Sequence, residues 1–171
     1  MNNKTSRSFA PDHSQTVTLA DGQIAHRQHA QQSEVLVRRF YEVRPGVWTF
    51  VGNGLSNQTF IEGPDGIIAI DTGDSTEEMR AAIAELRQVT DRPIVAIMYT
   101  HFHYIMGTDA IYEDGSPRST PVYGHEKVAY NRARASSEIA TTYIRGLIEQ
   151  FAIMLPKSGP DGVVNVGLGH F

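Results

Sequence analysis

The sequence contains no cysteine among its 171 residues. Disulfides and thiolate ligands are therefore excluded, and a bound metal would be held by histidine, aspartate, glutamate or water. The net charge is −4 and no Lys/Arg-rich run is present, which argues against a nucleic-acid partner. No apolar run approaches the roughly 20 residues that cross a bilayer, and residues 1–8 lack the apolar core of a secretory signal. We therefore expect a cytoplasmic protein that binds neither nucleic acid nor membrane.

Composition predicts one globular domain preceded by a polar segment. With 40% hydrophobic residues, the chain is long enough to bury one sizeable core. Residues 1–35 are rich in Gln, Ser, His and Asp and show little hydrophobic periodicity, which predicts a flexible polar leader. Ordered structure is expected to begin near Val35, and residues 36–171 form the predicted domain.

Short apolar runs separated by turn residues predict an antiparallel meander. Strands are expected at residues 47–51, 57–61 and 67–70, and Pro64-Asp-Gly66 turns the chain between the last two. The short connections make these strands antiparallel neighbours.

A capped helix and a further strand follow the meander. Ser75 and Glu78 have the spacing of a capping box, and Met79, Ile83 and Leu86 share one face of the helix that it opens. Residues 94–99 then form an apolar strand. A strand, a helix and a second strand indicate a right-handed crossover, and therefore an α/β (α+β) fold.

Two histidines, one residue apart, come directly after this apolar strand. Side chains at i and i+2 of a strand project to the same side, so His101 and His103 are expected to converge on one metal ion. Neutral imidazole suits zinc, and two such ligands make half of a tetrahedral site. Alternatively, the two rings only pack or form hydrogen bonds.

Other residues allow both a functional and a structural interpretation. Asp71 follows the preceding strand, where it either orients a histidine or caps the helix start and stabilises the turn. Phe102, Ile105 and Met106 either line an apolar groove or are ordinary core and loop residues. A long stripe is expected to be core rather than a cofactor site; it comprises Ile139, Tyr143, Leu147 and Phe151. His125 and Glu126 diverge on any regular element, and the remaining histidines are expected to be exposed; these are His13, His26, His29 and His170.

The order of motifs resembles the metallo-β-lactamase superfamily, and within it the alkyl sulfatase-like branch. The superfamily pattern is carried by Asn57-Gln-Thr-Phe-Ile-Glu-Gly63, Ile70-Asp-Thr-Gly73 and Tyr99-Thr-His-Phe-His103. The branch is indicated by Gly124-His-Glu126, Leu155-Pro156, Gly162 and Gly167-Leu-Gly169. The resemblance runs from about Val47 to the end. It implies an αββα sandwich of which this chain holds the first part only, so that residues 36–171 form a partial domain.

The metal motif of this family, HxHxDH, falls on residues 101–106. His101 and His103 match its first two histidines, whereas Ile105 replaces the aspartate and Met106 replaces the third histidine. Isoleucine has no donor atom, and a thioether is a poor substitute for imidazole on zinc. The family uses two zinc ions; the two replacements predict at most one here, held by His101 and His103.

The resemblance implies a metal-dependent hydrolase that cleaves sulfate esters when its remaining ligands are present. Its substrate would be a small alkyl sulfate-like ester, attacked by metal-activated water. The alternative is a non-catalytic, truncated or degenerate module without a functional binuclear site, which the Ile105 and Met106 replacements favour. Without the second sheet of the sandwich, one apolar face of the first sheet is left uncovered, so a homodimer is also expected.

Overall fold

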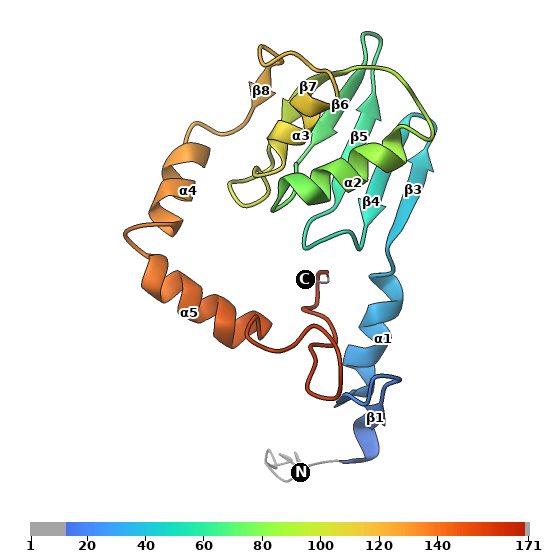
Figure 1. Cartoon of the computed structure of the whole chain (residues 1–171), viewed down its shortest axis with the longest axis vertical. Coiled ribbons are helices and arrows are strands. Elements are labelled where there is room, and N and C mark those ends of the chain that lie inside the picture. Colours follow the sequence, from blue (N-terminus) through green and yellow to red (C-terminus); the bar gives the residue numbers. More distant parts are fainter. Residues whose placement is uncertain (1–12, 170–171) are drawn as a thin grey trace, which may run out of the picture.

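A six-stranded mixed sheet forms the centre of the protein (Figure 1). The computed structural model describes residues 13–169. Neighbouring strands follow chain order: β3 (Arg39–Arg44), β4 (Val47–Val51), β5 (Gln58–Glu62), β6 (Ile67–Ile70), β7 (Ile94–Met98) and β8 (Val122–Tyr123). Pairing is antiparallel from β3 to β6 and parallel from β6 to β8. The α/β class, the meander and the parallel strand pair of the crossover are confirmed, and β3 and β8 extend the sheet beyond the strands predicted from sequence.

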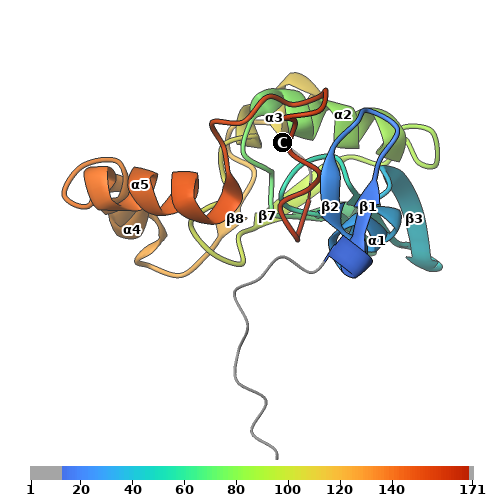
Figure 2. The same cartoon turned by 90° about the horizontal axis from the view of Figure 1, so that it is seen from below.

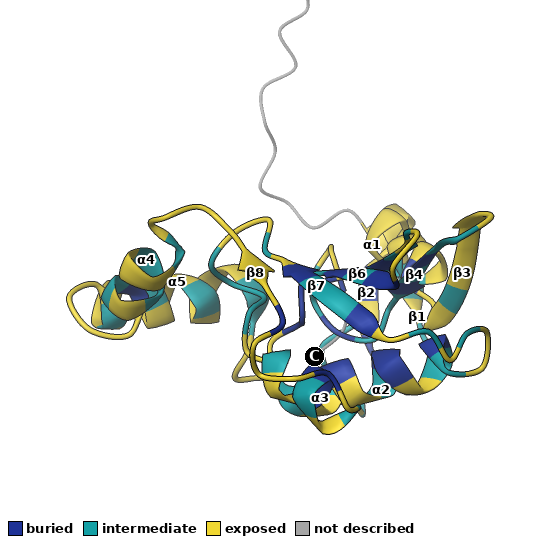
Figure 3. Cartoon of the chain, turned by 90° about the horizontal axis from the view of Figure 1, so that it is seen from above, coloured by how far each residue is buried: buried dark blue, intermediate teal, exposed yellow. Residues whose placement is uncertain are grey.

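Two helices cover one face of this sheet (Figure 3). Helix α2 (Thr76–Leu86) begins after Ser75, whose hydroxyl accepts a hydrogen bond from the Glu78 amide. The Glu78 carboxylate in turn accepts from the Asp74 amide at 2.9 Å, so the cap is reciprocal but reaches one residue further back than a capping box. Helix α3 (Thr108–Glu113) packs beside α2. The predicted apolar face of α2 is confirmed, because Met79, Ile83 and Leu86 are buried.

The hydrophobic core lies between these helices and the sheet. Alternate residues of the strands point into it, as the period of two requires. The intervening residues form the opposite sheet face and remain partly or fully exposed. Met98 on that face is 42% exposed. The far-face side chains of the central strands include Val47, Thr49, Thr59, Ile61, Ile68, Ile70 and Met98.

Helices α4 (Val128–Ala135) and α5 (Ala140–Phe151) lie to one side of the sheet (Figure 2). The prediction that the α5 stripe belongs to the core is wrong, because no residue of α5 is buried. Its partly buried side chains instead line a cavity described below. None of the helices within residues 13–169 is long and apolar enough to span a membrane.

Regular structure begins earlier than Val35. A 3₁₀ turn (His13–Gln15), a hairpin of β1 (Thr16–Thr18) and β2 (Ile24–His26), and α1 (Arg27–Val35) all precede that point. Residues 1–12 lie outside the described part of the chain. The division into a leader, residues 1–35, and a domain, residues 36–171, stays a prediction.

A buried asparagine ties α1 to the C-terminal segment. Asn165 donates through its amide nitrogen to the His29 carbonyl at 2.9 Å and to the Ser33 hydroxyl at 2.8 Å. The His29 ring bonds to the Asn165 carbonyl at 3.1 Å. This contact was not predictable from sequence composition, because its partners are more than 130 positions apart. The segment after α5 therefore returns to the N-terminal elements (Figure 1).

Candidate active site at the carboxyl ends of β6 and β7

A cavity of about 650 Å³ lies where the histidine loop faces α4 and α5. The loop supplies His101, His103 and Tyr104, and α4 supplies Arg132. One face of α5 supplies Tyr143, Leu147 and Phe151, spaced at intervals of four residues. Its remaining lining residues are Leu55, Asp74, Gln150, Ile153 and Leu168.

His101 and His103 lie side by side, but not on a strand. Strand β7 ends at Met98, and both histidines belong to the irregular loop that follows. The strand argument for their convergence is therefore wrong, although the loop brings the rings to 5.1 Å between centroids. His103 also stacks against Tyr143 of α5, with centroids 6.2 Å apart. His101 is exposed, His103 is partly buried, and both residues line the cavity.

Backbone bonds fix this loop against the end of β6. The Asp71 amide donates to the Met98 carbonyl at 2.9 Å, and the Thr72 amide donates to the Tyr104 carbonyl at 2.8 Å. Gly73 and Ile105 form an isolated parallel bridge. The expectation that Asp71 and the histidine pair occupy corresponding strand ends is confirmed.

The Asp71 carboxylate is connected to His101 through Thr100. One carboxylate oxygen accepts from the Thr100 amide at 2.9 Å, and the other accepts from its hydroxyl at 2.6 Å. The Thr100 oxygen lies 2.8 Å from His101 Nδ1. Asp71 is 7% exposed and has φ of 54°, a left-handed conformation that few residues other than glycine adopt.

This chain of bonds determines the His101 tautomer. A carboxylate accepts only, so the single Thr100 hydroxyl proton is used on Asp71. The contact between Thr100 and His101 then requires the Nδ1–H of the imidazole to donate to the Thr100 oxygen. Neutral His101 therefore keeps its lone pair on Nε2, the nitrogen left available for a proton or a metal ion.

The electrostatics of the cavity favour neutral groups. Burial lowers the pKa of His103, and the positive charges of His101 and Arg132 lower it further. Burial raises the pKa of Asp74, which Arg132 partly offsets. Burial also raises the pKa of the Tyr104 phenol. Neutral imidazole is the form that binds metal, so the lowered pKa keeps His103 competent at neutral pH.

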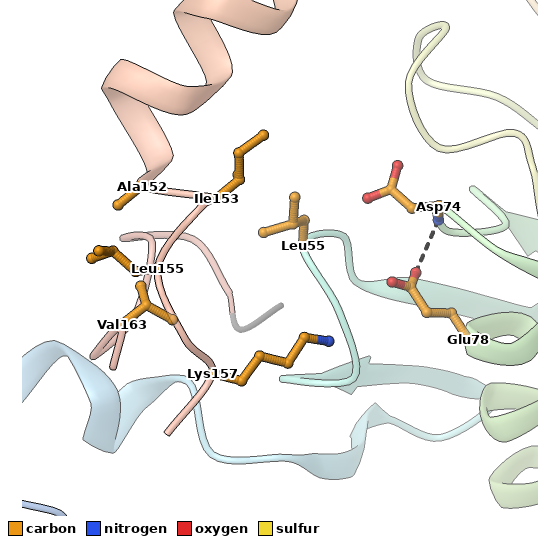
Figure 4. A pocket seen from close by; sticks show the side chains of 8 residues that line it. All are labelled: Leu55, Asp74, Glu78, Ala152, Ile153, Leu155, Lys157 and Val163. Atoms are coloured by element: carbon orange, nitrogen blue, oxygen red, sulfur yellow. Dashed lines mark hydrogen bonds between the residues drawn. The ribbon is translucent and has the colours of Figure 1, made fainter. Parts of the chain in front are cut away.

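A second, smaller cavity of about 370 Å³ adjoins the first (Figure 4). Both cavities are lined by Leu55, Asp74 and Ile153. Burial raises the pKa of Glu78, the bond from the Asp74 amide opposes this rise, and the Asp74 charge adds to it. In Figure 4 the Asp74 and Glu78 carboxyl groups point in different directions, and the Lys157 amine faces the same space. This arrangement gives no indication that the two carboxylates share a proton.

Several residues singled out from sequence lie outside the cavity. Ile105 and Met106 do not line it, and Met106 is 48% exposed; neither does Phe102, so the groove interpretation of these residues is wrong. His125 and Glu126 are exposed in the segment before α4. His125 Nδ1 accepts from the Lys127 amide, a local turn contact. His13, His26 and His29 are exposed, as predicted. His170 lies outside the described residues.

Sequence reasoning missed Arg132 and the cavity-facing role of α5. The sequence did show the four-residue spacing of Tyr143, Leu147 and Phe151. This spacing predicts an amphipathic helix, but it does not predict which part of the protein the helix faces. Within residues 13–169, no group of three or more His, Asp or Glu side chains is arranged to hold a metal ion. In the described part of the chain, no third side chain of these types is therefore placed to hold an ion together with His101 and His103.

Residues 51–104 match the family model of the metallo-beta-lactamase superfamily. The match covers β5, β6, α2, β7 and the histidine pair. Over 91% and 95% of the chain, the fold is shared with two structures of a sec-alkylsulfatase: a double mutant of PisA1 (TM-score 0.67, 24% identity) and Pisa1 from Pseudomonas sp. (TM-score 0.64, 23% identity). The chain covers 28% and 29% of those two structures.

Curated relatives point to the same branch. A linear primary-alkylsulfatase from Pseudomonas sp. (strain ATCC 19151) is 41% identical over 113 residues, covering 64% of this chain. A second linear primary-alkylsulfatase from Pseudomonas sp. is 35% identical over 145 residues, covering 81% of this chain. The chain spans about a fifth of the length of these relatives: 21% in both cases. Together the matches place it in the metallo-β-lactamase superfamily, with its alkyl sulfatase-like members.

Proposed function

We propose that His101 and His103 bind one zinc ion at the wall of the large cavity, as part of a hydrolase for alkyl sulfate esters. The observation that carries the proposal is the pair of imidazole rings, 5.1 Å apart, both facing the cavity. The hydrogen bond from His101 Nδ1 leaves Nε2 free for the ion. The matched alkylsulfatases support sulfate esters as the substrate class.

The two imidazoles suit zinc but fill only half of a tetrahedral set. A bound zinc ion would activate water and polarise the ester oxygen. The residues of this chain bind and orient: Asp71 and Thr100 hold the His101 ring, and Tyr143 packs on the His103 ring. The apolar side chains of α5 line the space beside the histidines, where an alkyl group would lie.

A non-catalytic role is the second candidate function. Ile105 and Met106 hold the positions of the family's aspartate and third histidine, and the described residues offer no third ligand of the His, Asp or Glu type. The partly exposed far face of the sheet favours a module that associates with another surface. A homodimer formed through this face is the partner we propose for that case. The cytoplasmic location stays a prediction.

Release of inorganic sulfate from octyl sulfate distinguishes the two functions. For a hydrolase, we expect zinc-dependent release by the wild-type chain and none after the double change His101→Ala with His103→Ala. His125→Ala is the matched control, because this histidine is exposed and outside the cavity, and it should leave the rate unchanged. Release at the buffer rate by every variant, with zinc present, would show that these residues alone are not a hydrolase and would support the non-catalytic module.

A further inference from the structure

We infer that the Arg132 guanidinium is the receptor for the anionic head group of the ligand, and that the α5 stripe receives its alkyl tail. This inference rests on the proposed function and assigns the substrate-holding residues that the metal pair does not provide. Arg132 reaches the cavity from α4, so it approaches the histidines from a different element than the loop that carries them.

Arg132 forms no ion pair with any carboxylate in the described part of the chain. Arginine remains charged at any physiological pH. Within residues 13–169, ion pairs hold six other arginines, whereas Arg132 takes part in none. The six are Arg80, Arg87, Arg92, Arg118, Arg134 and Arg145. Its guanidinium is therefore available to an anion that enters the cavity.

The position of Arg132 fits an anion beside the histidines. Arg132 lines the same cavity as His101 and His103, and Asp74 is the one aspartate of that cavity. A planar guanidinium donates two parallel hydrogen bonds to the oxygens of a tetrahedral anion.

The rest of the cavity fits an alkyl chain. Tyr143, Leu147 and Phe151 lie on successive turns of one face of α5. Tyr143 is next to His103, and Phe151 is eight positions further on, or roughly 12 Å at 1.5 Å per residue. Other apolar lining comes from Leu55, Ile153 and Leu168. A cation at the histidine end and an apolar track leading away from it match an amphiphilic anion.

Equilibrium binding of octyl sulfate and 1-octanol tests this inference without metal or turnover. The two probes share the tail and differ in the head group, and both are used below their micelle or solubility limits. Arg132→Gln is expected to weaken octyl sulfate binding about tenfold, because a charge-assisted contact is lost, while 1-octanol binding is unchanged. Arg132→Lys should recover part of the loss. Added salt should weaken octyl sulfate binding to the wild type more than to Arg132→Gln.

Arg145→Gln is the matched control, because Arg145 lies on α5, pairs with Glu149 and does not line the cavity. Unchanged octyl sulfate binding in Arg132→Gln, or an equal loss in Arg145→Gln, would overturn the inference. So would equal losses of both probes in Arg132→Gln, since these indicate a structural role. If binding depends on Arg132 but the chain never releases sulfate, the binding inference is supported and the proposed hydrolase activity is contradicted.

Discussion

Asp71→Asn should lower the zinc affinity of the chain about 10- to 100-fold, the usual cost of removing a partner that orients a metal ligand. The amide nitrogen takes the place of the oxygen that accepts from the Thr100 hydroxyl. The amide nitrogen donates to the Thr100 hydroxyl oxygen. The Thr100 hydroxyl then donates its own proton to His101 Nδ1. His101 then carries its proton on Nε2, where the ion would bind.

The substitution is a clean one because asparagine has nearly the shape of aspartate and tolerates the left-handed backbone of position 71. Zinc titration gives the affinity, and ¹⁵N chemical shifts of the imidazole report the tautomer. Thr100→Val should lower the affinity as well, whereas Thr100→Ser keeps the hydroxyl and should retain it. An unchanged tautomer in Asp71→Asn, with wild-type zinc affinity, would show that Asp71 only stabilises the turn.

Gly107→Ala is expected to lower the free energy of unfolding by about 3 kcal/mol. An added Cβ would lie 1.9 Å from the Thr72 carbonyl oxygen and 2.6 Å from Met79 Cβ. The Thr72 oxygen belongs to the backbone and cannot rotate away as a side chain could. Either α3 or the end of β6 must therefore shift. The Thr72 amide also holds Tyr104 in the histidine loop, so the shift should weaken zinc binding too.

Urea unfolding measures this loss, and Gly146→Ala is its matched control. Gly146 lies within α5, and a Cβ there would meet nothing within 4 Å. Alanine should therefore stabilise this exposed helix by up to about 1 kcal/mol, the difference in helix propensity. A Gly107→Ala chain that unfolds at the wild-type urea concentration would contradict the close approach of this loop to α2.

The central strands were predictable because their side chains alternate between a buried and a partly exposed face. Residues 47–51 and 67–70 match β4 and β6, and Ser75 marks the start of α2. Strand β3 was not predictable in this way: Arg39–Arg44 carries three charged side chains and is mostly exposed at the sheet edge. Strand β8 has two residues, too few for any periodicity.

The position of the histidine pair in the candidate site was predictable, but the surroundings of the pair were not. The spacing and family resemblance of His101 and His103 indicated the pair, and Asp71 was expected at the matching strand end. The Thr100 contact depends on how an irregular loop folds, which no periodicity reports. Arg132 and Leu147 enter the cavity because α4 and α5 turn back toward that loop, a tertiary arrangement without a local signal.

Zinc content per chain tests the central claim most directly. After equilibration with zinc and removal of unbound ion, elemental analysis should find at most one ion per wild-type chain. The double change His101→Ala with His103→Ala should reduce this to background, and His125→Ala should leave it unchanged. Two tightly held ions per wild-type chain, or zinc retained by the double variant, would contradict the assignment of this histidine pair as the metal ligands.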